Sequence, residues 1–122
     1  MDDRELARLI ATLRVSAGTV AFVAPRWTIR TWTGQSLDSG AANMVARSLA
    51  GREIAIGLGT VIAMNKDAPV RGWIEAGMVA DLTDALASFF AIRRIAPIRA
   101  LLSAVASGAS VALGYRLADA LG

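Results

Sequence analysis

The stretch VADLTDALASFF, Val79–Phe90, places Asp81 and Asp84 among apolar and small residues. The preceding apolar stretch, ARSLAGREIAIGLGTVIAM (Ala46–Met64), also contains charges of both signs, namely Arg47, Arg52 and Glu53. Charged side chains in the middle of long apolar segments are costly unless they meet opposite charges or hydrogen-bond partners. We therefore predict that these stretches are helices whose charges face one another inside a bundle.

The overall composition favours embedding in a membrane. Of the 122 residues, 55% are hydrophobic and 19% charged, whereas soluble domains have roughly 45–50% and about 25%. The mean hydropathy of +0.50 points the same way. Because the length allows one domain and no composition shift divides it, residues 1–122 are predicted to form a single domain.

Cysteine and histidine are both absent from the chain. This excludes thiol nucleophiles, disulfides, histidine-ligated haem and nearly every kind of zinc site. No catalytic, cofactor-binding or metal-binding residues are predicted, and no cofactor is expected. The net charge is +3, but the basic residues are scattered rather than clustered, so no nucleic-acid partner is expected. The acidic start MDDREL does not resemble a signal peptide, so the first helix is expected to be retained.

Four helices are predicted, at about residues 6–24, 41–64, 70–92 and 97–121, separated by proline- and glycine-containing turns. Each is long enough to cross a bilayer. The predicted fold class is therefore all-α, a four-helix antiparallel transmembrane bundle with short loops. None of the four contains 18 consecutive uncharged residues, which keeps a soluble or peripheral helical bundle open as the alternative.

Between the first two predicted helices lies the linker PRWTIRTWTGQSLDSG, Pro25–Gly40, in which tryptophan and arginine alternate. Amphipathic rings and long cationic side chains both prefer the headgroup region of a membrane. A soluble loop with two packed tryptophans is the alternative interpretation.

If the four helices alternate in direction across the bilayer, opposite charges near the midpoints of the first three helices lie at one depth in the membrane. Asp81 then lies level with Arg52, and Asp84 lies about 5 Å away on the same side as Arg47, at 1.5 Å per residue. We expect Asp81 to be buried next to Arg52, and Asp84 to approach Arg47. The candidate intramembrane charge network comprises Arg14, Arg47, Arg52, Glu53, Glu75, Asp81, Asp84 and Arg116. Because Arg47, Arg52 and Glu53 spread around their helix, one of them is expected to point away from the network.

Small residues recur at helical spacing in the same segments. Ser103, Ser107, Ser110 and Gly114 share one face of the last predicted helix, and Ala55 and Gly59 repeat the pattern on the second. Small residues allow membrane helices to approach closely. Packing within one molecule is the expected use of these faces, and a dimer interface is the alternative.

The motifs ARSLAGREIAIGLG and GMVADLTDALASF resemble those of small four-helix bacterial membrane proteins of the DoxX-like kind and of related families of unknown function. The resemblance implies an arginine-bearing, glycine-rich second helix followed by an acidic third helix, and a location in the bacterial inner membrane with several crossings. It implies no catalytic residues.

Three functions are compatible with these observations. The first is a non-enzymatic integral membrane protein, either an accessory subunit of a partner membrane protein or a small homo-oligomer, in contact with membrane lipid. The second is a proton- or solute-coupled transporter component that uses Glu53, Asp81 and Asp84, because carboxylates inside a membrane are functional candidates. The third is an enzyme or redox accessory with a carboxylate metal site that adds Glu75, although di-iron bundles normally also supply histidine. Arginine and lysine are equally numerous at the two ends of the predicted bundle, so the side of the membrane that each end faces is not predicted.

Overall fold

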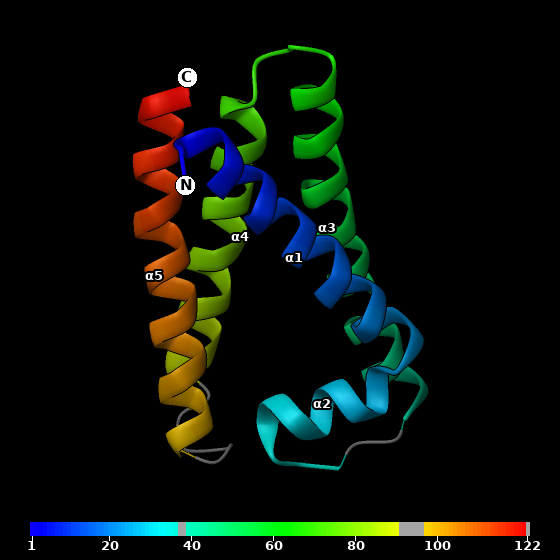
Figure 1. Ribbon diagram of the computed structural model, residues 1–122. Helices are drawn as coiled ribbons and strands as arrows, with labels where there is room; N and C mark the ends of the chain where they lie inside the picture. Colours follow the sequence, from blue (N-terminus) through cyan, green and yellow to red (C-terminus); the bar gives the residue numbers. More distant parts are fainter. Residues whose placement is uncertain (37–38, 91–96, 122) are drawn as a thin grey trace.

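Helices account for every regular element of the part of the chain that the structure describes, which confirms the all-α prediction. The computed structural model describes the backbone of residues 1–36, 39–90 and 97–121, and the side chains of residues 1–36, 39–87 and 105–121. The helices, in chain order, are α1 (Asp3–Val23), α2 (Pro25–Thr33), α3 (Gly40–Asn65), α4 (Arg71–Phe90) and α5 (Pro97–Leu121) (Figure 1). The predicted extension of the third helix to residue 92 lies outside the described residues.

Local signals in the sequence set the first residues of α1 and α3. Asp2 and Glu5 form a reciprocal capping box at the start of α1, in which the Asp2 carboxylate accepts from the Glu5 amide at 2.8 Å. The Ser39 hydroxyl accepts from the Ala42 amide at 3.0 Å and caps α3. These caps satisfy backbone donors that the first helical turn leaves unpaired.

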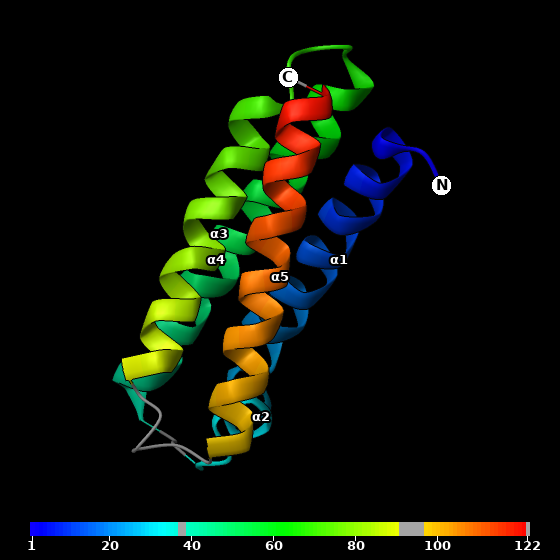
Figure 2. The ribbon, with the colours of Figure 1, turned by 90° about the vertical axis from the view of Figure 1, so that its left-hand side faces the viewer.

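The predicted linker after the first helix is wrong in part, because its first nine residues form α2. Pro25 occupies the first helical turn, where its fixed φ is favourable and its missing N–H costs nothing. Gly34 ends the helix with a φ of 74°, a conformation that glycine adopts without strain. The resulting short helix lies across the end of the bundle rather than along it (Figures 1 and 2).

The four long helices are arranged as two closely packed pairs. In the N-terminal pair α1 lies along α3, and in the C-terminal pair α4 lies along α5, with much less contact between the pairs. Figure 2 shows α3, α4 and α5 running in roughly the same direction, with the turn between α3 and α4 at the same end as both termini, whereas Figure 1 shows α1 crossing obliquely in front of them. The bundle therefore has one end formed by the termini and the α3–α4 turn, and an opposite end formed by α2.

Two glycines allow α1 and α3 to approach each other. A Cβ atom at Gly57 would lie 2.6 Å from the carbonyl oxygen of Ala11, and one at Gly18 would lie 2.8 Å from the carbonyl oxygen of Ala50. Distances of this size are too short for real side-chain atoms. The absence of a side chain at both positions therefore sets the separation of the N-terminal pair.

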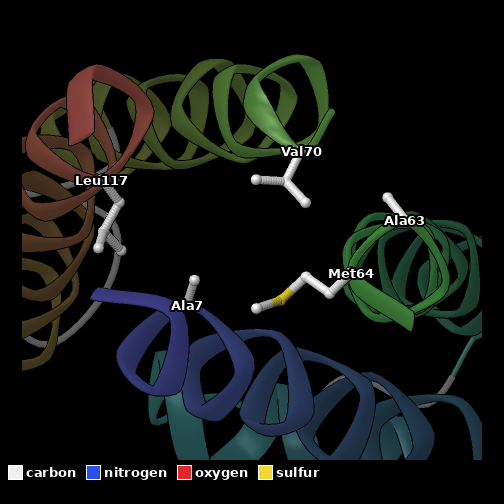
Figure 3. Packing of buried hydrophobic residues seen from close by; sticks show 5 residues of the cluster. All are labelled: Ala7, Ala63, Met64, Val70 and Leu117. Carbon is white, nitrogen blue, oxygen red and sulfur yellow. The ribbon is translucent and has the colours of Figure 1, made fainter. Parts of the chain in front are cut away.

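The buried apolar core is small and is built mainly from short side chains. Its main cluster, near the end that carries the termini, consists of Ala7, Ala63, Met64, Val70 and Leu117 (Figure 3). Among the described residues no large side chain is completely buried. Large apolar side chains instead lie on the outside of every long helix, and among them are Leu9, Leu13, Val20, Met44, Leu49, Leu58, Ile62, Val79, Leu82, Leu86 and Val105.

By length and composition, α1 is the one helix within the described residues that qualifies as a membrane crossing. Charged residues in α3 and α4, such as Arg52, Glu53 and Asp81, reduce the mean hydropathy of those helices. Only 17% of the apolar window of α1 is buried inside the structure.

Candidate functional site

The centre of the bundle contains a cluster of charged side chains from three helices, with Arg14 of α1 in the middle. One terminal nitrogen of Arg14, Nη1, donates to Glu53 at 2.7 Å and to Asp81 at 3.1 Å. The other, Nη2, donates to the second oxygen of Asp81 and, at 3.4 Å, to the backbone carbonyl of Gly77. Only 13% of the Arg14 side chain and 9% of the Asp81 side chain are exposed. The two residues form a buried, bidentate ion pair.

Space for the Arg14 guanidinium depends on Gly77, which lies one turn before Asp81 on α4. A Cβ atom at Gly77 would lie 3.0 Å from Nη2 of Arg14. Because Gly77 has no side chain, the guanidinium can reach both the carbonyl oxygen of Gly77 and the carboxylate of Asp81.

A second arginine extends the cluster toward α2. Nη2 of Arg52 donates to both carboxylate oxygens of Asp84, at 3.1 and 3.0 Å, and more weakly to Glu53 at 3.4 Å. Glu53 thus contacts both arginines. The ion pairs form a continuous chain in the order Asp81, Arg14, Glu53, Arg52, Asp84, which we call the charge network.

Two of the predicted pairs differ from those found. Asp81 is bonded to Arg14 instead of Arg52, and Arg52 is bonded to Asp84, the residue predicted to approach Arg47. Helix midpoints place Arg14 and Arg52 at the same depth, so depth does not distinguish between them. The direction of each side chain around its helix does, because Asp81 reaches α1 whereas Asp84, three residues later, reaches α3.

Arg47 lies outside the charge network, in agreement with the expectation that one charge of α3 points elsewhere. Its Nε donates to the carbonyl oxygen of Phe22 at 3.0 Å, and its guanidinium lies 5.7 Å from the centre of the Phe22 ring. It therefore satisfies one of the carbonyls left unpaired at the end of α1.

Glu75 and Arg116 are the other predicted members that the structure does not bring into the network. Glu75 pairs with Arg71 on its own helix at 2.7 Å, and Arg116 pairs with Asp3 at 2.9 Å. Both pairs are exposed at the end that carries the termini. A metal site containing Glu75 is therefore not formed.

The network contains three carboxylates and two guanidinium groups, so one negative charge is in excess when all five groups are ionised. Oxygen atoms of Glu53, Asp81 and Asp84 lie within 4.8 Å of one another. Two guanidinium groups already bond these oxygens and would repel a divalent ion. This arrangement suits a stable internal ion-pair network better than a divalent metal.

The carbonyl oxygen of Gly77, which is part of the site, and the close-packed Gly18 on α1 were not predicted from the sequence. A signal for Gly18 is present, because the buried residues of α1 are Ala7, Ala11 and Gly18, which share one face and are all small. No comparable signal marks a backbone carbonyl as a hydrogen-bond acceptor.

Comparison with known proteins adds no relative to these observations. No protein-family model, curated protein or solved structure matches the chain.

Proposed function

We propose that this protein is a non-enzymatic integral membrane protein in which the charge network joins two helix pairs inside a bilayer. The observation that carries the proposal is the distribution of side chains. Charged groups such as Asp81 are buried at the centre, whereas large apolar groups such as Val79, 65% exposed, and Val105, 60% exposed, lie outside. Hydrocarbon around the bundle would accommodate this surface, which water would not.

The limited burial of α1 supports the same proposal. A core helix of a soluble protein passes the length and hydropathy criteria too, but most of its surface is buried, unlike that of α1. The charges near the middle of α3 and α4, namely Arg52, Glu53, Asp81 and Asp84, do not argue against a crossing, because they pair within the charge network. A single unpaired charge at a bilayer centre costs about 2.5–3.5 kcal/mol on insertion scales. Paired charges avoid most of that cost.

Helix α2 has the composition of a helix lying in a membrane interface. Trp27 and Trp32 are 52% and 55% exposed, and the same nine residues contain Arg26 and Arg30. Lying across the end of the bundle, the helix would be parallel to the bilayer plane at headgroup depth.

The proposal places membrane lipid around the bundle. The resemblance to DoxX-like proteins and an accessory or homo-oligomeric role in the bacterial inner membrane belong to this proposal as well.

Single-cysteine labelling tests the membrane arrangement, since the native chain has no cysteine. We expect Ser36→Cys, near α2, and Gly72→Cys, at the opposite end, to react with a membrane-impermeant maleimide from opposite sides. Intact cells should label one variant, and permeabilised cells both. Val105→Cys, about a third of the way along α5, should react at least tenfold more slowly, because lipid excludes the reagent and suppresses the thiolate.

A soluble or peripheral bundle would give a different pattern. Neither end would be labelled in intact cells, and Val105→Cys would react as fast as the two end positions after lysis without detergent. That outcome would overturn the membrane proposal.

A second candidate function is proton coupling, and the uneven charge of the network favours it. The network has one carboxylate more than it has arginines, and Asp84 is the most exposed of the three acids, with 38% of its side chain accessible. Intramembrane carboxylates commonly serve as proton relays.

Proteoliposomes carrying a pH-sensitive dye test this candidate. If the network conducts protons, wild-type protein should dissipate an imposed pH gradient, and Asp84→Asn should slow the dissipation at least tenfold. Glu75→Gln is the matched control, because Glu75 lies outside the network and should leave the rate unchanged. Wild-type vesicles that hold the gradient as long as empty vesicles would remove proton coupling and leave the first proposal in place.

A further inference from the structure

A groove of about 410 Å³ runs along the outside of the bundle between α3 and α4. Its volume is in the range of small-molecule and lipid sites, roughly 300–1,000 Å³. One side is a continuous face of α3, and the other is formed by the start of α4, where the Trp73 ring packs directly on Gly59. The lining residues are Ala55, Leu58, Gly59, Ile62, Ala63, Lys66, Ala68 and Trp73.

The groove is apolar except at one end, where Lys66 follows the last turn of α3. Lys66 is the one lysine of the chain. Within the described residues its ammonium group takes part in no hydrogen bond or ion pair. The neighbouring acid, Asp67, is 94% exposed and lies 3.9 Å from Arg4. An apolar channel that ends at an available cation is complementary to a molecule with an apolar chain and an anionic head.

We infer that this groove binds one phospholipid of the surrounding bilayer, with an acyl chain between α3 and α4 and the phosphate at Lys66. The inference rests on the proposed membrane function. From Ala55 to Lys66 the floor of the groove extends about 16 Å, at 1.5 Å per residue. One leaflet contributes about 15 Å to a hydrocarbon core of roughly 30 Å. The groove thus has the depth of one leaflet, with its charged end at the surface.

Trp73 provides the means of detection, because it forms one wall of the groove. In a Trp27→Phe, Trp32→Phe background, Trp73 is the only tryptophan, since the chain contains three. Purified protein in detergent micelles would be titrated with phosphatidylglycerol whose acyl chains carry bromine, a quencher that acts at short range. We expect Trp73 fluorescence to fall saturably, with the plateau reached at about one bound lipid per protein.

Three variants make the interpretation specific. Ala55→Phe fills the inner end of the groove and should abolish the saturable phase, whereas Ala17→Phe, on an exposed position of α1, should not. Lys66→Gln should raise the half-saturating concentration of phosphatidylglycerol about fivefold, because one surface cation contributes about 1 kcal/mol to binding an anionic lipid. In the same variant, the half-saturating concentration of brominated phosphatidylcholine should change less than twofold.

Quenching that rises linearly with the brominated fraction, and equally in Ala55→Phe, would overturn the lipid site. The cysteine labelling described above separates this failure from failure of the membrane proposal. If the two ends are labelled from opposite sides but quenching never saturates, only the lipid site is wrong. If the labelling pattern is that of a soluble bundle, both proposals fall.

Discussion

Arg14→Leu should greatly reduce the yield of folded, monodisperse protein recovered after extraction. This is the largest loss of yield that we expect from any single substitution in the charge network. Within the described residues, Arg14 is the one cation bonded to Asp81, and it also binds Glu53. Its removal leaves a buried carboxylate unpaired and raises the excess negative charge. Removing one partner of a buried pair costs about 3–5 kcal/mol, a large fraction of the stability of a small domain.

The double variant Arg14→Leu, Asp81→Leu distinguishes loss of a pair from loss of a necessary arginine. It restores the wild-type charge balance, and we expect it to recover at least half of the folded protein. Asp81→Asn alone should be milder than Arg14→Leu, because Arg14 keeps Glu53 as a partner. Arg116→Leu, which breaks the exposed pair with Asp3, should have little effect. A double variant no better than the single one would contradict this account.

Gly57→Ala should separate α1 from α3 and lower the midpoint of thermal unfolding strongly. The added Cβ atom would lie 2.6 Å from the Ala11 carbonyl oxygen and 2.7 Å from a methyl carbon of Val15. A backbone oxygen cannot move aside as a flexible side chain can, so the helices must shift. Overpacking of this kind costs about 1–3 kcal/mol. Thermal unfolding monitored by circular dichroism measures the change.

The same substitution at Gly51, on the same helix, is the matched control. No atom outside the local helix lies within 4 Å of a Cβ at Gly51, so Gly51→Ala should leave stability unchanged or raise it by removing a poor helix former. If both alanine variants unfolded at the same temperature, close helix packing at Gly57 would not determine the separation of the N-terminal pair.

The helical class and the depth of the interior charges could be predicted from the sequence, because both follow from spacing along one chain. The length of the apolar segments predicts helices, and the midpoints of these helices predict which charged residues lie at the same height along the bundle. The partners could not be predicted in the same way. Whether Asp81 meets Arg14 or Arg52 depends on how each helix is rotated about its axis, and rotation follows from close contacts such as those of Gly18 and Gly57.

Helix α2 was missed for a different reason. Its sequence, PRWTIRTWT, contains three threonines, which are weak helix formers, and nine residues are too few for a helix to be stable on its own. Packing against the ends of the long helices compensates for this low propensity, and Pro25 is buried there. The start signal at Pro25 and the stop signal at Gly34 were both present in the sequence, nine residues apart from start to finish.

The arrangement of the long helices as two pairs has a consequence for how the chain is assembled as it is made. The N-terminal pair is completed first, and its inner surface has a net positive charge from Arg14, Arg52 and Glu53. Among its described side chains, the C-terminal pair brings the carboxylates of Asp81 and Asp84 to the shared interior, which makes that part of its inner surface negative. Each half is thus an unneutralised intermediate that attracts the other. A chain divided at the α3–α4 turn would yield two fragments that select each other by charge.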